Sequence, residues 1–580
     1  MSARFKSLLA AGIYLAASML LLLPPMHFRF DRELIASARA WPTDPSIFMW
    51  SFCWWPTAIT HGLNPFLTRL VWWPVKQNLL WITSIPSLAL LLAPVTYFFG
   101  PLVSYNVAAL LAPVMSAWAT YLLCREVTDR FWPAVLGGWL FGFSSYEFVQ
   151  LGGHMNLFVT VALPLAAWLY VRRRKSKLSR GWYVAWIALL AIFQFGVSTE
   201  MLASAVLLGL LAALADVFLR RPEHAKPRGA GPGERGEQNE RRSCAQSRLL
   251  SGCWSLFLET CAGLAVAGIL LLPCFYLLFF VHYARGAFWP ASYVSADPLN
   301  FIIPTRITWL GGGLALPLSI HFTGAGEYER GAYLGAPLVA MVVMFIREFR
   351  KQRTGRFLGL LLAILVLLCL GPRLQVLRHS TPIVLPWILF AHLPLFSKIF
   401  PERLVVYVWL AAAVIAAWWL AASKTNRGWK LALAGLTILY LLPNVFAGLW
   451  VHPVQNPAFF AKRELVRYLP RGARVVVLPY YYYGYSMLWQ AETHFYFSMV
   501  GGYTGPRIPG RLWSYPAVKA FRVGHPVSKH YPAELQRFIK AFHVQAIIIP
   551  DHDSYDSPTL LAPLSIRPIH VGGVRLYRLP

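Results

Sequence analysis

A small set of ionisable side chains lies in the polar segments between long apolar runs. In a membrane protein such groups are candidates for binding or chemistry, because charge near a bilayer is costly to keep. Carboxylates could act as general bases or bind a cation, imidazoles could transfer protons, and an arginine could hold a phosphate. The candidates are Asp44, His61, Glu147, His154, Glu200, Asp297, Glu329 and Arg403.

Asp44 lies between Thr43 and Pro45, directly before an aromatic run. This pattern is typical of a helix start, where Asp is a common N-cap and Pro is common at the first helical position. The same place would also hold a carboxylate at the membrane surface, where it could act as a general base or bind a cation beside a phosphate. The two interpretations are compatible.

Three further candidates each have a structural interpretation beside the functional one. His154 follows two glycines at the edge of an apolar run, where a hydrogen-bonded structural histidine is the commoner case. Glu200, in GVSTEML, is either part of a structural turn or a buried acid. Arg403, in LFSKIFPERL, either extends to lipid headgroups from the end of a span or binds a lipid phosphate with two hydrogen bonds.

The composition identifies the setting of these residues as a membrane. Of 580 residues, 57% are hydrophobic and only 13% are charged, against about a quarter charged in soluble domains. The net charge of +29 would suit nucleic-acid binding. However, the basic residues form short clusters between apolar runs, such as 172–180 and 347–356. Such clusters mark the cytoplasmic side, so the sequence indicates a multi-pass protein of the plasma (inner) membrane.

The apolar runs predict a polytopic α-helical transmembrane domain over 1–450 with about eleven spans. A span needs about 20 apolar residues. We interpret the run 79–100, which contains Pro86 and Pro94, as interfacial or re-entrant, because every later basic cluster would otherwise fall outside. The N-terminus is then cytoplasmic, 27–102 is a large first outer loop, and 221–250 is a disordered cytoplasmic loop. The predicted spans lie near 7–25, 103–123, 132–146, 157–171, 182–198, 201–219, 254–280, 332–346, 357–371, 404–422 and 431–450.

The last 130 residues differ in kind. RVVVLPYYYY is typical of a strand, PAELQRFIKAF of an amphipathic helix, and HVQAIIIPD of a second strand. We therefore expect a small α/β domain over 451–580, on the outer face with the candidate residues. The tyrosine tract, PYYYYGYSMLWQ, is more typical of a packing surface than of a sugar-binding platform. The turn 551–553 is more typical of a solvated loop than of a metal site.

Several segments together resemble the GT-C superfamily of membrane glycosyltransferases, and more closely bacterial polytopic proteins of the YfhO type. They are spread over nearly the whole chain, and each is loosely defined. One span followed by a long outer loop with an early Asp is part of the resemblance. The segments are TDPSIFMWSFCWWPTAITHGLNPF, GPLVSYNVAALLAPVMSAWATYLLCREVTD, FGFSSYEFVQLGGHMNLF, ERGAYLGAP, LPLFSKIFPERL and GYSMLWQAETHFYFSMVGGY.

The resemblance implies a transferase that takes a sugar from a polyprenyl-phosphate donor on the outer face. It implies that Asp44 is catalytic, with Asp31 as the alternative, and that Arg403, in Pro-Glu-Arg, binds the lipid phosphate. The first loop lacks the acidic pair usual in that superfamily, so a divalent cation is left open. The acceptor would be a glycan, lipid or protein of the cell envelope. His154 and Glu200 would join Asp44 in catalysis, and the other candidates, His61, Glu147, Asp297 and Glu329, would line the binding site.

Two other functions are open at this stage. A lipid or polysaccharide transporter or flippase would need charged residues along a path through the spans, and the sequence has few. A non-catalytic membrane assembly protein would use the outer domain for docking. Convergence of Asp44, Glu200 and Arg403 on one outward cavity would favour the transferase, whereas dispersed positions would favour the assembly protein.

Overall fold

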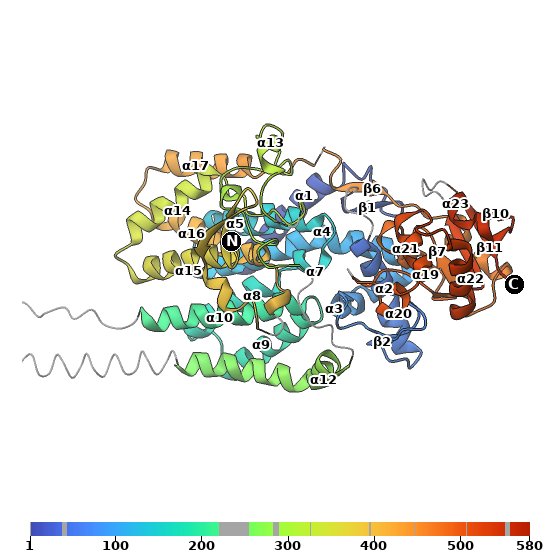
Figure 1. The fold of residues 1–580 in the computed structure, drawn as a ribbon. Coiled ribbons are helices and arrows are strands. Elements are labelled where there is room, and N and C mark those ends of the chain that lie inside the picture. The colour runs from blue at the N-terminus through green and yellow to red at the C-terminus, as the bar shows by residue number, and fades with distance from the viewer. Residues whose placement is uncertain are drawn as a thin grey trace, which may run out of the picture.

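A computed structural model of the chain describes most of its length (Figure 1). The predicted disordered loop 221–250 lies outside the described residues, as do His552 and Asp553 of the turn 551–553. The described residues are 2–37, 43–219, 254–281, 289–324, 326–393, 396–445, 447–505, 507–551 and 557–580.

Long apolar helices form most of the first 450 residues. Within the described residues, five helices are long and apolar enough to cross a membrane. A sixth span results if the helix Trp254–Leu270 and α12 (Leu272–Phe280), which meet at 68°, are one broken span. The five are α1 (Ala3–Leu22), α4 (Ala93–Thr128), α7 (Met155–Phe158) with α8 (Ala162–Arg174), α10 (Thr199–Phe218), and η4 (Pro401–Leu404) with α16 (Val405–Ala422).

Shorter helices occupy the other predicted spans. They have 12 to 17 residues, and a bilayer core needs about 20 in one straight helix. The polytopic helical architecture agrees with the prediction, and the count of about eleven spans stays a prediction. These helices are α5 (Phe131–Gly142), α9 (Arg180–Phe195), α14 (Ala336–Phe349), α15 (Arg353–Cys369) and α17 (Arg427–Tyr440).

The run 79–100 contains no continuous helix of span length. It holds the short α3 (Pro86–Leu91) and the start of α4, where Gly100 breaks the helical backbone with φ 86° and ψ 170°. Tyr97, Phe98 and Phe99 point outward and are 83%, 73% and 68% exposed. Exposed aromatic rings are typical of a segment at the membrane interface, and the interfacial placement stays a prediction.

The C-terminal residues form a unit built on a five-stranded mixed sheet of order β10-β11-β9-β7-β8. β7 runs parallel to β8 and β9, and β9 runs antiparallel to β11. β-Branched residues fill the buried central strands, as packing on both faces favours. The elements are β7 (Arg474–Val477), α19 (Ser486–Glu492), β8 (Ser498–Met499), α21 (Pro516–Val523), α22 (Tyr531–Phe542), β9 (Ala546–Pro550), β10 (Ile569–Val571) and β11 (Val574–Arg578).

This C-terminal unit is bound to the first loop. In Figure 1 it lies at one end of the helices, beside α2 (Thr43–Thr60). β1 (Glu33–Ile35) pairs antiparallel with β6 (Val451–Pro453), just before the unit begins. The Trp50 indole donates to Gln490 of α19 at 2.8 Å, and one buried apolar core runs from α1 to β11. The loop and the unit therefore fold against each other.

The basic clusters gather at the opposite end of the helices. There Arg173 pairs with Glu259 at 2.6 Å, and Arg174 and Arg353 both pair with Asp216 near the end of α10. In Figure 1 this end of α10 and the turn between α14 and α15 point away from the C-terminal unit. The charge asymmetry has the form that the positive-inside rule describes, and the orientation drawn from it stays a prediction.

Candidate functional site

Four of the predicted site residues stand at or just before helix starts, and a fifth, Glu329, lies in a loop. Asp44 lies in the first turn of α2, so it is not the N-cap, and Glu200 lies in the first turn of α10. His154 directly precedes α7, Arg403 lies in η4 ahead of α16, and Glu329 lies in the segment that leads to α14. A carboxylate in the first turn is favourable because it faces the positive end of the helix dipole.

Arg403 holds two carboxylates at once. Its Nη1 lies 2.7 Å from Glu200 Oε2, and its Nε lies 3.2 Å from both oxygens of Glu329, which its Nη2 also contacts. The other Glu200 oxygen accepts from the Phe400 amide at 3.2 Å. The side chains are only 7–19% exposed. A charge so removed from water must be paired, and the planar guanidinium suits two carboxylates.

The network continues from Glu329 to Asp44. Gln150 Nε2 donates to Glu329 Oε2 at 3.2 Å, and Gln150 Oε1 lies 2.9 Å from His154 Nδ1. The amide oxygen can only accept, so Nδ1 carries a hydrogen. His154 Nε2 then faces Asp44 Oδ2 at 3.7 Å. An unprotonated Nε2 would repel a carboxylate, so a proton on either member stabilises this pair.

The environment of Asp44 combines burial with exposure on one side. Its side chain is 34% exposed, so solvent or a substrate hydroxyl can reach it. Burial raises the pKa of the Asp44 carboxyl and is the largest effect, partly offset by His154, by Arg403 and by a hydrogen bond from Tyr503. The hydroxyl of Tyr105, also near Asp44, is buried and has no hydrogen-bond partner among the described residues. The carboxyl is therefore more basic than an ordinary Asp, as a general base requires.

Glu329 behaves differently from Asp44. Burial would raise the pKa of its carboxyl, but Arg403, His154 and the hydrogen bonds from Arg403 and Gln150 together lower that pKa below the ordinary Glu value. Glu329 therefore stays ionised near neutral pH and serves as the fixed negative partner of Arg403. The site thus holds one carboxyl poised to take up a proton and one that keeps its charge.

Glu147 is buried next to this network but is not part of it. One oxygen accepts a hydrogen bond from the Thr160 hydroxyl, and the other has no partner among the described residues. Burial raises the pKa of Glu147 well above its ordinary value. A neutral acid fits this apolar place within α6 (Ser145–Leu151), and its position is structural.

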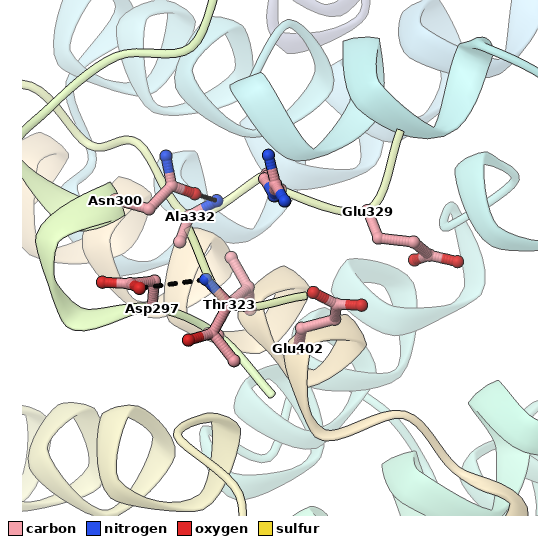
Figure 2. Close-up of a pocket in the computed structure, with 10 residues that line it drawn as sticks. Asp297, Asn300, Thr323, Glu329, Ala332 and Glu402 are labelled. Atoms are coloured by element: carbon pink, nitrogen blue, oxygen red, sulfur yellow. Dashed lines mark hydrogen bonds between the residues drawn. The ribbon is translucent and has the colours of Figure 1, made fainter. Parts of the chain in front are cut away.

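Asp297 and His61 lie apart from the network. The Asp297 carboxylate accepts from three backbone amides, those of Leu299, Thr323 and Leu377, at 2.7–3.0 Å. It therefore braces the loops that hold these three amides, as Figure 2 shows for Thr323. His61 is exposed just after α2, and among the described residues its hydrogen bonds go to its own helix end, with Nδ1 2.9 Å from the Thr57 carbonyl.

A small interior gap lies behind Glu329 (Figure 2). It leaves no room for a water molecule and is also lined by Asp297, Arg330 and Glu402. Asp297 and Glu329 lie on opposite sides of it in the view. Arg330 donates to the Ser319 and Phe322 carbonyls at 2.8 Å, so it fixes the loop that carries Glu329. Among the described residues, no three His, Cys, Asp or Glu side chains are grouped as a metal site.

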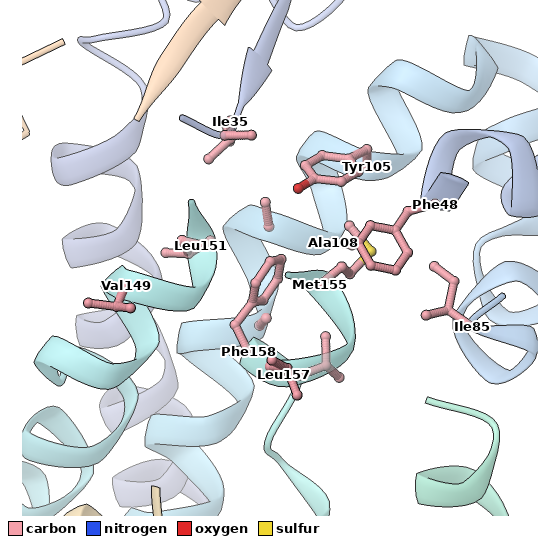
Figure 3. Close-up of a cluster of buried hydrophobic side chains, with 14 of the residues drawn as sticks. Ile35, Phe48, Ile85, Tyr105, Ala108, Val149, Leu151, Met155, Leu157 and Phe158 are labelled. Atoms are coloured by element: carbon pink, nitrogen blue, oxygen red, sulfur yellow. The ribbon is translucent and has the colours of Figure 1, made fainter. Parts of the chain in front are cut away.

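An apolar core supports the helix starts that carry Asp44 and His154. Figure 3 shows Phe48 of α2, Tyr105 of α4 and Met155 and Phe158 of α7 around one cluster. These side chains are fully buried. Close packing leaves such side chains little freedom, so α2 and α7 are fixed relative to each other and Asp44 and His154 stay face to face.

Sequence reasoning missed Gln150 and Tyr503. Gln150 lies four residues before His154, but an uncharged side chain gave no chemical signal. Tyr503 ends the segment GYSMLWQAETHFYFSMVGGY of the C-terminal unit, 459 residues after Asp44, and only the fold brings it near. Glu329 and Arg403 were found as separate candidates, and the structure shows that they form one ion pair.

A family described as "Domain of unknown function (DUF6311)" matches residues 13–234. No curated protein matches the chain. Among solved structures, the arabinofuranosyltransferase AftD from Mycobacteria is similar with a TM-score of 0.56 and 13% identity. The match covers 100% of this chain, which spans 40% of the length of AftD. The oligosaccharyltransferase of Archaeoglobus fulgidus in its apo form is similar with a TM-score of 0.51 and 11% identity, covering 94% of this chain and 70% of that one.

At these identities the similarity shows the fold. It confirms the expected GT-C resemblance, whereas the closer resemblance to proteins of the YfhO type stays a prediction. The chain is a multi-pass membrane protein with the fold of the GT-C glycosyltransferases.

Proposed function

We propose that this protein is a membrane glycosyltransferase that moves a sugar from a polyprenyl-phosphate donor to a cell-envelope acceptor on the outer face. The observation that carries the proposal is the convergence of Asp44, His154, Glu329, Arg403 and Glu200 on one network in a GT-C fold. These residues come from five separate segments of the chain. A transporter or an assembly protein would not need a partly exposed base such as Asp44 at the end of a buried ion-pair network.

In the proposed reaction, Asp44 takes the proton of an acceptor hydroxyl. The hydroxyl oxygen forms a bond to the anomeric carbon as the bond from that carbon to the phosphate oxygen breaks. The bonding electrons leave with the lipid phosphate. Asp44 is the side chain of the network with the exposure and the raised pKa that this role needs.

The role of Arg403 is refined by its contacts. Its Nε, Nη1 and Nη2 all already donate to Glu200 or Glu329, so binding a phosphate would require displacing a carboxylate. We therefore propose that Arg403 mainly positions Glu329, which holds Gln150 and through it His154.

Lys398 is the candidate for binding the negatively charged phosphate of the donor. It ends η3 (Phe396–Lys398), five residues before Arg403, and its ammonium lies 3.9 Å from the centre of the Trp81 ring. Burial and, to a lesser degree, Arg507 lower the pKa of Lys398 to about 8. A second cation nearby means that an anion bound there would be stabilised by both charges.

The test is a transfer assay with the full-length protein in lipid nanodiscs. The probes are synthetic polyprenyl-phosphate hexoses and pentoses, with release of polyprenyl phosphate as the readout. Asp44→Asn is expected to lower release at least about 100-fold, because loss of a general base costs about 10²–10⁴-fold. Asp31→Asn is the matched control, since Asp31 lies in the same loop and is 70% exposed. Unchanged release by Asp44→Asn, or loss with Asp31→Asn alone, would remove Asp44 from the mechanism.

A further inference from the structure

Helix α14 has a second apolar face, directed away from the core. Its buried side chains, such as Leu338, Met341 and Phe345, belong to the core, where α14 packs against α16 and α17. A separate stripe of residues recurs every three or four positions, so it lies along another face of the helix. The side chains of this stripe are exposed or half-buried, and they are Ala336, Val339, Ala340, Val343, Met344 and Arg347.

This stripe and Ile302 together line a groove with a volume of about 380 Å³. Binding sites for small ligands have volumes of about 300–1,000 Å³. Ile302 borders the groove near the start of α14, because the neighbouring Phe301 carbonyl accepts from the Leu334 amide at 3.0 Å. The helix rises about 16 Å from Ala336 to Arg347. One leaflet is about 15 Å deep, half of a hydrocarbon core of about 30 Å, so the groove has the length of an acyl chain in one leaflet.

Arg347 lies at the end of the groove that belongs to the basic end of the helices. Its side chain is exposed and forms no ion pair with any described residue. Glu348 is next in sequence, but neighbouring positions on a helix do not share a face, and Glu348 accepts from the Lys424 amide at 2.8 Å. Arg350 and Lys351 add two more exposed positive charges within the following turn. This end of the groove therefore attracts an anion.

We propose that the groove binds an anionic phospholipid, with its phosphate on Arg347 and one acyl chain along the apolar stripe. An arginine can donate two hydrogen bonds to one phosphate, and its methylene stem can lie along an apolar face while the charge stays at the interface. Basic residues next to a membrane helix attract anionic lipids. The inference does not depend on the proposed transfer reaction.

Two other occupants fit the groove less well. A donor lipid for the proposed reaction would have its phosphate near Asp44, beside the C-terminal unit, whereas Arg347 lies in the last turn of α14, which points away from that unit (Figure 1). A second copy of the chain in the same membrane would share its orientation, and a two-fold contact uses the same surface on both partners. Contact along the stripe would then bring two Arg347 side chains together, and like charges repel.

Native mass spectrometry of the delipidated full-length protein in detergent tests the charged end. The probes are dioleoyl phosphatidylglycerol and dioleoyl phosphatidylcholine, which share their acyl chains and differ in headgroup charge. The wild type is expected to bind one phosphatidylglycerol at least about tenfold more tightly than phosphatidylcholine, because a hydrogen bond to a charged group is worth that factor. Arg347→Gln should lose most of this preference. Arg427→Gln, which removes an exposed charge at the start of α17, should keep it.

A second pair of variants tests the apolar part of the groove. Val343→Trp puts a large ring into the groove and should prevent the tight binding of phosphatidylglycerol. Leu360→Trp on α15 is the control, because Leu360 does not line the groove and is 43% exposed, against 40% for Val343. Melting temperatures show whether each variant folds. If Val343→Trp does not fold, the comparison of Arg347→Gln with Arg427→Gln decides the question.

Three results would overturn the proposal. The first is wild-type binding of phosphatidylglycerol by Arg347→Gln or by a folded Val343→Trp. The second is displacement of phosphatidylglycerol by an equal concentration of polyprenyl phosphate, which would assign the groove to a lipid of the donor type. The third is a wild-type dimer without tightly bound lipid that Val343→Trp dissociates, which would assign the groove to a second copy of the chain.

Discussion

Replacing Arg403 by glutamine would leave Glu200 and Glu329 without their shared counter-charge. The three side chains are 14%, 19% and 7% exposed, so water screens the remaining carboxylates poorly. At an effective dielectric constant of about 20, two unit charges about 4 Å apart interact by about 4 kcal/mol. Breaking a buried ion pair by removing one partner costs about 3–5 kcal/mol. We therefore expect Arg403→Gln to destabilise the protein by about 3–5 kcal/mol.

Thermal unfolding in detergent, followed by intrinsic fluorescence, measures this effect. Arg32→Gln is the control, because Arg32 forms an ion pair with Asp31 that is 78% and 70% exposed, and exposed pairs contribute little. The triple variant Arg403→Gln, Glu200→Gln, Glu329→Gln removes all three charges and should recover much of the lost melting temperature. The ion-pair account is wrong if Arg403→Gln has the same melting temperature as Arg32→Gln. It is also wrong if the triple variant has a melting temperature no higher than that of Arg403→Gln.

Three further predictions concern single groups. Glu147→Gln should change the free energy of unfolding by less than about 1 kcal/mol, because the acid is already neutral and the amide oxygen can still accept from Thr160. A large fall in melting temperature would contradict this. Lys398 should lose its charge as pH rises through about 8, so donor KM should rise above that pH in the wild type, whereas Lys398→Arg should show no such rise. Burial raises the pKa of Glu492 to about 7, so the folded state binds the extra proton and stability falls as pH rises from the unfolded Glu value to about 7. Glu492→Gln should abolish that fall, roughly 3 kcal/mol, in thermal melts at pH 4.5 and 8. The same pH dependence in the variant would show that Glu492 is not the group responsible.

Much of the site was predictable because its residues are ionisable and stand beside apolar runs. Asp44, His154, Glu200, Glu329 and Arg403 were all selected on that ground, and the structure brings them together. Their pairing was not predictable, since Arg403 and Glu329 are 74 residues apart and sequence distance carries no information on which ends of helices meet. The prediction that Arg403 binds a phosphate followed from its residue type and from the resemblance, and the sequence does not show that Glu200 and Glu329 occupy its guanidinium.

The helices were predictable from apolar runs, but their lengths were not. Periodicity and hydropathy locate α5, α9, α14, α15 and α17, yet cannot show where each helix ends, because Gly, Pro and polar turns interrupt the runs. β7 and β9 follow from β-branched runs, whereas β8, β10 and β11 were not predicted. The pairing of β1 with β6 joins segments over 400 residues apart. His61 and Asp297 were chosen by residue type alone, which does not separate a loop brace from a binding group.

The most direct test of the central claim uses cells of the source organism that lack the gene. Mass spectrometry of their lipid extract should show accumulation of one polyprenyl-phosphate sugar, together with loss of that sugar from the cell envelope. The wild-type gene and the Asp31→Asn variant should reverse both changes, and Asp44→Asn, made at equal protein level, should reverse neither. No change in lipid-linked sugars on deletion, or full restoration by Asp44→Asn, would contradict a transferase that depends on Asp44.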